Sequence, residues 1–267
     1  MIKKYFLIFI FLVFSSLSHI YASEILIQST TSTRDSGFYD FILPKYPRYN
    51  DSQIKVVAVG TGQAIKNAKN CDADLLIVHD SIKEINFMNN KFGIKRENLM
   101  YNDYVLIGPT SDPANVKSSP SIESSFKKIF NGSHMFVSRS DSSGTHSFEI
   151  SVWEAANIDP KIHSGKWYLE TGQGMGQSLN IAVSTQSYIL TDRSSWENFM
   201  NKQGHSILYE NSIELANTYG IILINPDHCP RMNYPDSLSL YNWLVSEDAK
   251  KHISDFTING TQVFYVD

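Results

Sequence analysis

Two segments rich in hydroxyl side chains and glycine each follow an apolar, β-branched run and precede a helical pattern. They are 28–37 (QSTTSTRDSG) and 138–146 (SRSDSSGTH). A helix N-terminus presents unpaired backbone N–H groups and the positive end of the helix dipole, and glycine lets a bound anion approach the backbone closely. Serine and threonine hydroxyls add neutral donors. The two segments therefore predict the two halves of a clamp for an oxyanion.

The second segment holds the strongest set of candidate ligands. Arg139 supplies the only formal positive charge in that loop, and its planar fork of N–H donors suits an oxyanion better than a lysine would. Asp141 either holds this guanidinium in place or caps the helix that follows. A surface salt bridge with an ordinary capping box is the alternative interpretation. The candidate ligands are Arg139, Ser143, Gly144 and Thr145, with Asp141 in support.

The first segment contains five consecutive hydroxyl residues, 29–33. An N-cap or a serine-threonine turn is the alternative interpretation, but one hydroxyl is enough for either. The excess of donors predicts ligand binding, and the candidates are Thr30, Thr31 and Ser32.

A third glycine-rich turn, 59–64 (VGTGQA), also opens a helix. Such a turn is a weak signal by itself, and this one lacks the Gly-Lys-Ser/Thr ending of a nucleotide P-loop. It adds Gly62 and Gln63 as candidate ligands, with Thr61 in support. Two further transitions into helices, 171–177 and 191–195, are candidates to line the same cleft, and Arg193 is a supporting residue there.

His79 and Asp80 follow the apolar run 74–78, at the sheet edge where open α/β proteins place their ligands. We expect these two side chains to form a mutually bonded structural pair.

Apolar runs alternate with helical patterns along the chain, which predicts an α/β fold with mainly parallel sheets. The expected strands are 25–28, 54–59, 74–78, 104–107, 135–138, 188–190 and 220–224, and the expected helices are 37–46, 63–70, 147–157, 175–185, 194–201 and 237–256. Two matching strands that end in proline, 102–109 and 219–226, are where we expect the chain to cross between two lobes. The first lobe then comprises 23–105 and 219–267 and the second 106–218, so the two clamp segments face one cleft.

Residues 1–22 have the pattern of a secretory signal peptide, because two lysines precede an apolar run of about ten residues and Ala22 ends the segment. The alternative, a membrane anchor, needs about 20 apolar residues. Removing residues 1–22 leaves 245, enough for two domains, and takes the formal net charge from −4 to −6. An acidic chain without a basic cluster does not favour nucleic acid or an anionic membrane. We expect a freely soluble periplasmic monomer, and a disulfide between Cys71 and Cys229 is as compatible with the sequence as two unpaired cysteines.

Catalytic and metal-binding patterns have little support. The sequence has no HExxH motif, no closely spaced set of His and Cys ligands and no GxSxG elbow, so we expect neither a metal cofactor nor an enzyme. A secreted serine hydrolase that uses Ser143 and His146 stays open as an alternative, although a nucleophile also needs an orienting acid and an oxyanion hole.

The order and spacing of these motifs resemble those of the substrate-binding components of bacterial ABC importers, specifically the tungstate-binding proteins. The matching segments run along most of the chain: STTSTRDSG (29–37), VGTGQA (59–64), DADLLIVHD (72–80), NDYVLIGP (102–109), SRSDSSGTH (138–146), GMGQSLNIA (174–182) and YILTDRSSW (188–196). The family pattern has glycine between the arginine and the aspartate of the clamp, where this chain has Ser140.

The resemblance implies a two-lobed type II periplasmic binding fold that closes on tungstate and delivers it to a membrane permease. The implied contacts are Thr31, Ser32, Gly62 and Gln63 from one lobe and Arg139, Ser143, Gly144 and Thr145 from the other. Molybdate and phosphate are alternative ligands of the same class. A carboxylate that faces the ligand would repel a deprotonated oxyanion but could accept a hydrogen bond from protonated phosphate. If Asp80 and Asp141 point away from the ligand, tungstate or molybdate is favoured over phosphate.

Overall fold

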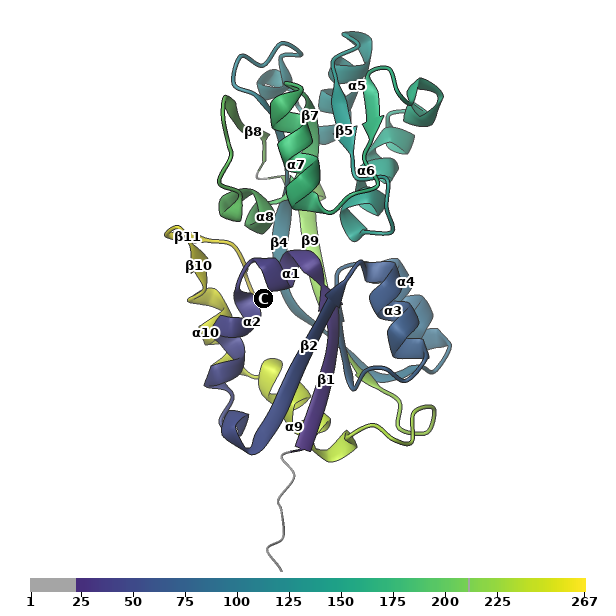
Figure 1. The fold of residues 1–267 in the computed structure, drawn as a ribbon, viewed down its shortest axis with the longest axis vertical. Coiled ribbons are helices and arrows are strands. Elements are labelled where there is room, and N and C mark those ends of the chain that lie inside the picture. The colour runs from purple at the N-terminus through teal and green to yellow at the C-terminus, as the bar shows by residue number, and fades with distance from the viewer. Residues whose placement is uncertain (1–22, 211) are drawn as a thin grey trace, which may run out of the picture.

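The computed structural model describes residues 23–210 and 212–267, so the expected signal peptide, residues 1–22, lies outside the described residues. Two lobes are stacked end to end and joined by two long strands, β4 (Gly93–Pro109) and β9 (Ala216–Ile224) (Figure 1). In this part of the chain, none of the helices combines the length and the apolar character needed to cross a membrane. The prediction of a two-lobed α/β fold is confirmed.

The first lobe is built on strands in the order β2-β1-β3-β9-β4. Strand β1 (Ser23–Thr30) pairs in parallel with β2 (Ser52–Val59) and β3 (Leu75–Val78), and β3 pairs antiparallel with β9. Along β3, Leu75 and Ile77 pack into the core under α2 and α9, whereas Leu76 and Val78 pack into the core under α3 and α4. The helices of this lobe are α1 (Thr31–Asp35), α2 (Phe38–Ile42), α3 (Thr61–Lys69), α4 (Ser81–Asn89), α9 (Tyr234–Leu244) and α10 (Glu247–Ser254).

The second lobe continues the sheet in the order β4-β7-β5-β6, with β8 also paired to β4. Strand β5 (Phe136–Ser138) is parallel to β6 (Tyr168–Glu170) and β7 (Tyr188–Asp192), and β8 (His205–Tyr209) is antiparallel to β4. Its helices are α5 (Ile122–Asn131), α6 (Gly144–Ala155), α7 (Met175–Ser184) and α8 (Arg193–Asn198). A small hairpin, β10 (Thr257–Ile258) and β11 (Thr261–Gln262), and 3₁₀ helices at Leu43–Lys45, Tyr49–Asp51, Val116–Ser118, Pro160–His163 and Ile213–Leu215 complete the elements.

Strand β4 changes lobe within its own length. From Gly93 to Asp103 it pairs with β9, and from Tyr104 to Pro109 it pairs with β7 and β8. Tyr104 and Val105 already pack in the cores of the second lobe. The predicted boundaries between the two lobes, between residues 105 and 106 and between residues 218 and 219, remain a prediction.

Several expected helix limits were wrong. The segment 37–46 forms α2 and the 3₁₀ helix Leu43–Lys45, which has Pro44 in its first turn, and Gly37, with φ of 83°, precedes α2 in a left-handed backbone. The segment 237–256 also divides in two, because Ser246 caps a new helix, α10, by accepting from the backbone N–H of Ala249. Helices α4 and α5 were not expected from the sequence.

Candidate oxyanion-binding site

Three of the predicted segments meet as helix starts between the two lobes. In the first lobe α1 begins at Thr31 and α3 at Thr61, and in the second lobe α6 begins at Gly144. The backbone N–H of Gly62 donates to the carbonyl oxygen of Ser142 at 3.4 Å, which joins the turn before α3 to the loop before α6. Two of the candidate loops, one from each lobe, therefore lie in direct contact.

Arg139 is the positive centre of this region. Its Nη2 donates to Asp141 Oδ2 at 2.5 Å, while Asp141 Oδ1 accepts from the backbone N–H of Ser143 at 3.1 Å and from its hydroxyl at 2.5 Å. Asp141 thus holds the guanidinium and the loop, and Ser143 is the cap of α6 because its Oγ accepts from the backbone N–H of His146. Both arrangements turn the Asp141 carboxylate toward its own loop.

Two buried donors in this region have no hydrogen-bond partner. Among the described residues the buried, unpartnered side-chain atoms are Thr61 Oγ1, Ser119 Oγ, Arg139 Nε, Ser206 Oγ and Tyr241 OH. Thr61 is 1% exposed and Arg139 is 7% exposed, and they come from opposite lobes. A buried donor left unpaired costs about 1–3 kcal/mol, so these two atoms are where a bound acceptor is expected.

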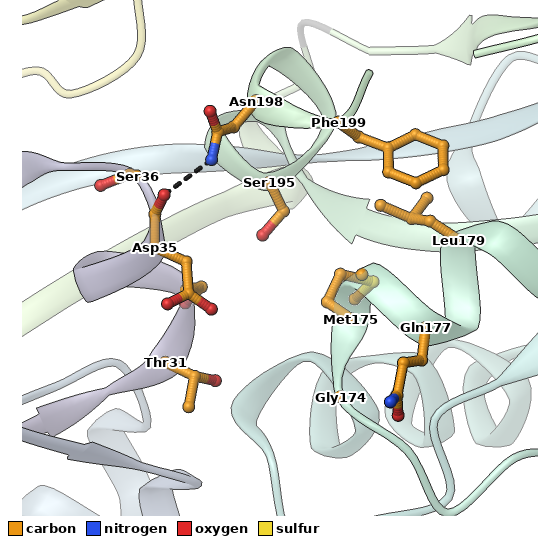
Figure 2. A pocket seen from close by; sticks show the side chains of 12 residues that line it. Thr31, Asp35, Ser36, Gly174, Met175, Gln177, Leu179, Ser195, Asn198 and Phe199 are labelled. Carbon is orange, nitrogen blue, oxygen red and sulfur yellow. Dashed lines mark hydrogen bonds between the residues drawn. The ribbon is translucent and has the colours of Figure 1, made fainter. Parts of the chain in front are cut away.

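The hydroxyl segment supplies donors of two kinds. Thr30 is buried and its hydroxyl is used inside the segment, 2.8 Å from Thr33 Oγ1. Thr31 and Ser32 are partly exposed and line a cavity of about 420 Å³. Figure 2 shows Thr31 on one side of this cavity, facing Met175 and Gln177 at the start of α7 and Ser195 of α8. Residues of the segments 171–177 and 191–195 therefore line the space between the lobes.

Asn198 closes one side of this cavity. Its Nδ2 donates to the carbonyl oxygen of Asp35 at 2.6 Å, so α8 of the second lobe is tied to α1 of the first (Figure 2). The cavity is therefore bounded by both lobes.

Two predicted side chains lie elsewhere. Gln63 is exposed and its Nε2 donates to Asn67 one turn along α3 at 2.6 Å. Arg193 donates to both oxygens of Asp103, at 2.7 and 2.6 Å, and to Glu210 at 2.7 Å, and these hydrogen bonds raise its pKa. Arg193 is thus held where β4 changes lobe, and its guanidinium has acidic partners of its own.

His79 and Asp80 were expected to bond each other, and this was wrong. His79 Nδ1 lies 3.0 Å from Asn217 Oδ1 and 3.4 Å from Tyr104 OH, so its partners come from the two crossing strands. Asp80 bonds Lys83 instead. Burial lowers the pKa of His79, and the negative charge of Asp192 partly opposes this effect. Only the folded chain brings strands β4 and β9 to this side chain.

The alternative Ser143–His146 dyad does not form. His146 Nδ1 lies 3.2 Å from Ser138 Oγ and 3.3 Å from Glu149 Oε2. The hydroxyl of Ser143 donates to Asp141 Oδ1. The imidazole therefore bonds Ser138 and Glu149, and the Ser143 hydroxyl is engaged by Asp141 instead.

Ser140 stands at a position of the clamp where glycine would be free of strain. Its φ is 48°, in the left-handed region that side chains rarely adopt. Its hydroxyl donates to Glu170 Oε1 at 2.8 Å, which ties the loop to the end of β6.

Cys71 and Cys229 form a disulfide, with their α-carbons 5.3 Å apart. Within the described ranges, these cysteines and His228 are also the group whose side chains lie close enough to share a metal ion. While the two sulfurs are bonded to each other, they are not thiolate ligands.

Comparison with known proteins places the chain in a family. Residues 19–248 match the model of the PBP superfamily domain. The tungstate-binding protein TupA of Peptoclostridium acidaminophilum is 37% identical over 235 residues, which cover 87% of this chain and 81% of that protein. TupA of Campylobacter jejuni is 35% identical over 240 residues, 88% of each chain.

A solved structure gives the same relationship in three dimensions. The tungstate-binding protein TupA of Desulfovibrio alaskensis G20 superposes with a TM-score of 0.81 at 36% identity, covering 92% of this chain and 99% of that chain. The chain therefore belongs to the PBP superfamily and, within it, to the family of the ABC-transporter tungstate-binding proteins.

Proposed function

We propose that this protein captures tungstate between its two lobes and delivers it to an ABC permease. The observation that carries the proposal is the pair of buried, unpartnered donors, Arg139 Nε and Thr61 Oγ1, on opposite lobes. A ligand that accepts from both would be held by both lobes at once. Such a ligand favours the state in which the lobes are in contact over the open one.

The remaining donors fit a tetrahedral dianion. The further donors that we propose are the hydroxyls of Thr31 and Ser32, which line the cavity of about 420 Å³, and free backbone N–H groups at the starts of α3 and α6, whose residues do not line that cavity. Hydrogen bonds to charged groups contribute about 1.5–3 kcal/mol each. Five or six of them would offset the cost of closure and approach nanomolar affinity, about 12 kcal/mol. Gln63, Gly144 and Thr145 would take part mainly through their backbone N–H groups, whereas those of Gly62 and Ser143 already donate to Ser142 and Asp141.

The setting of the protein follows the same proposal. Residues 1–22 would direct export and be cleaved near Ala22, and the mature protein would act in the periplasm as a monomeric carrier without catalysing a reaction. Its partner would be the membrane permease of the transporter, and it would need no cofactor besides its oxyanion ligand.

Molybdate is the nearest competing ligand, because the two ions have nearly the same size, charge and shape. Phosphate is less favoured, because the Asp80 and Asp141 carboxylates are bonded to protein donors. We draw the preference for tungstate over molybdate from the named relatives.

Thermal unfolding of residues 23–267 with tungstate, molybdate, phosphate and sulfate in turn tests the proposal. A ligand that binds only the folded protein raises the melting temperature according to its affinity. A large shift with tungstate that excess molybdate does not displace supports tungstate capture. Equal shifts of the melting temperature with tungstate and molybdate indicate a general carrier of oxyanions. No shift with any of the four anions would overturn the proposal and favour the alternative of a serine hydrolase.

A further inference from the structure

We propose that Lys83 neutralises the carboxylate of Asp80, so that this carboxylate neither repels the ligand nor accepts a hydrogen bond from it. This ion pair then sets the preference of the site for a fully deprotonated dianion over hydrogen phosphate. The inference rests on the proposed function. Lys83 is then a positioning residue that acts through Asp80, without contact to the ligand.

Asp80 follows directly on a residue that packs against the start of α6. The residue before it, His79, packs so closely on Gly144 that a Cβ there would lie 2.8 Å from the His79 carbonyl oxygen. The loop that carries Asp80 therefore lies against the first turn of α6, whose N-terminal N–H groups are candidate ligands. Asp80 Oδ2 lies 2.6 Å from Lys83 Nζ, which in turn lies 3.2 Å from Ser147 Oγ on α6, so the carboxylate is close to the first turns of this helix.

The structure engages both oxygens of the Asp80 carboxylate with Lys83. Oδ1 accepts from the backbone N–H of Lys83 at 3.1 Å, and Oδ2 accepts from Lys83 Nζ at 2.6 Å. The Asp80 side chain is 11% exposed, whereas the Lys83 side chain is 41% exposed at the rim. Asp80 thus caps α4 through the backbone N–H of Lys83, and the ammonium of the same lysine neutralises its carboxylate.

The other carboxylates of this region are engaged in the same way. Asp141 accepts from Arg139 and Ser143, and the buried Asp192 accepts from Ser194 and Ser195. Each of these partners belongs to the same lobe as its carboxylate. Asp80 differs from the other two because a single flexible lysine neutralises it.

A released Asp80 would change which anion the site prefers. An unpaired carboxylate repels a dianion across a poorly solvated gap, where charges interact more strongly than in water. The same carboxylate can accept a hydrogen bond from the hydroxyl of hydrogen phosphate. Loss of the Lys83 ammonium is therefore expected to weaken tungstate binding and to spare phosphate binding.

Lys83 also has a second contact that must be separated from the first. Its Nζ lies 3.2 Å from Ser147 Oγ, on α6 of the other lobe. A role as a tie between the lobes would make Ser147→Ala resemble the loss of Lys83. A role through Asp80 would not.

The experiment measures the affinities for tungstate and phosphate by calorimetry and competition, with residues 23–267. The wild type is compared with four variants: Lys83→Met, Asp80→Asn, Asp80→Asn/Lys83→Met and Ser147→Ala. Methionine at position 83 keeps the backbone N–H that the residue at position 80 caps, and asparagine is a good N-cap. All variants are therefore expected to fold. Melting curves without ligand check this.

We expect Lys83→Met to weaken tungstate binding by about tenfold or more and to shift the tungstate-to-phosphate ratio toward phosphate. The double variant is expected to recover tungstate affinity to within about threefold of the wild type, and Ser147→Ala to change it by less than about threefold. The inference would be overturned if Lys83→Met bound tungstate as tightly as the wild type, or if the double variant did not recover tungstate affinity. It would also be overturned if Ser147→Ala lost as much tungstate affinity as Lys83→Met. A wild type that does not bind tungstate would instead overturn the proposed function on which the inference rests.

Discussion

Gly144 of the second lobe and His79 of the first lobe are in contact so close that only a hydrogen fits between them. A Cβ on Gly144 would lie 2.7 Å from both Cε1 and Nδ1 of the imidazole. The ring cannot turn aside easily, because Nδ1 is bonded to Asn217 and the ring packs on Tyr219 with centroids 4.8 Å apart. The contact between the lobes at the start of α6 therefore depends on glycine at position 144.

The substitution Gly144→Ala is accordingly expected to weaken tungstate binding by about tenfold or more, because the methyl group keeps the lobes from reaching this contact. Calorimetry measures the affinity and melting curves measure stability. Gly176→Ala is the comparison variant: Gly176 also lies in the first turn of a helix and lines the cavity, but a Cβ there meets nothing within 4 Å, so the variant adds a methyl group without the clash. Equal affinities for Gly144→Ala and the wild type would show that this contact is not part of the ligand-bound state.

Arg139→Ala is expected to reduce tungstate affinity by about 100-fold, because it removes the charged donor whose Nε is buried and unpartnered. The ligand-free protein should keep its fold, since Asp141 retains its bonds to Ser143. Arg48→Ala, at an exposed arginine paired with Asp236, controls for loss of a positive charge. If Arg139→Ala bound tungstate as tightly as the wild type, the clamp assignment would be wrong.

His79 makes stability depend on pH. Burial lowers its pKa in the folded protein, so between the folded value and the ordinary value of 6.5 the unfolded chain binds a proton that the folded protein does not. The stabilisation is complete above about pH 6.5 and is lost as pH falls toward the folded value. We expect the melting temperature to decrease less from pH 7.5 to 5.5 in His79→Gln than in the wild type. The difference should be about 2–4 °C for each kcal/mol of stability that the wild type loses through protonation of His79.

His252→Gln, on α10, is the control for the replacement of a histidine by glutamine. A His79→Gln variant with the same pH slope as the wild type would contradict the assignment of a buried neutral imidazole.

Reduction of the Cys71–Cys229 disulfide is expected to lower the free energy of unfolding without removing tungstate binding. The bond closes a loop with a sequence separation of 158 residues, and the chain-entropy estimate for such a loop is about 5 kcal/mol. It joins the segment between α3 and β3 to the segment after β9, and neither cysteine lines the candidate cavity. Denaturant unfolding of Cys71→Ser/Cys229→Ser against the wild type measures the loss, and calorimetry at 25 °C checks the affinity. Equal stability would contradict the expectation.

Local sequence determined much of this site. The hydroxyl and glycine residues at 28–37 and 138–146 do open helices, and the apolar runs around them do form strands, because capping and strand formation depend on residues near in sequence. The pairing of Arg139 with Asp141 is likewise local, since only Ser140 separates them.

Helix α4 shows where local patterns are insufficient. Ile82 and Ile85 are exposed, at 83% and 55%, so its apolar residues do not mark a core-facing stripe. Its start depends on Asp80 as N-cap, which the sequence analysis had assigned to a pair with His79.

Only the tertiary structure decided the partners that come from distant segments. His79 bonds a residue 138 positions away, and Arg193 bonds one 90 positions away, because the crossing strands β4 and β9 bring these side chains together. The choice between a disulfide and two free cysteines was likewise decided by the distance between their backbones. Residue types state which bonds a side chain can make, but the fold decides which partners lie within reach.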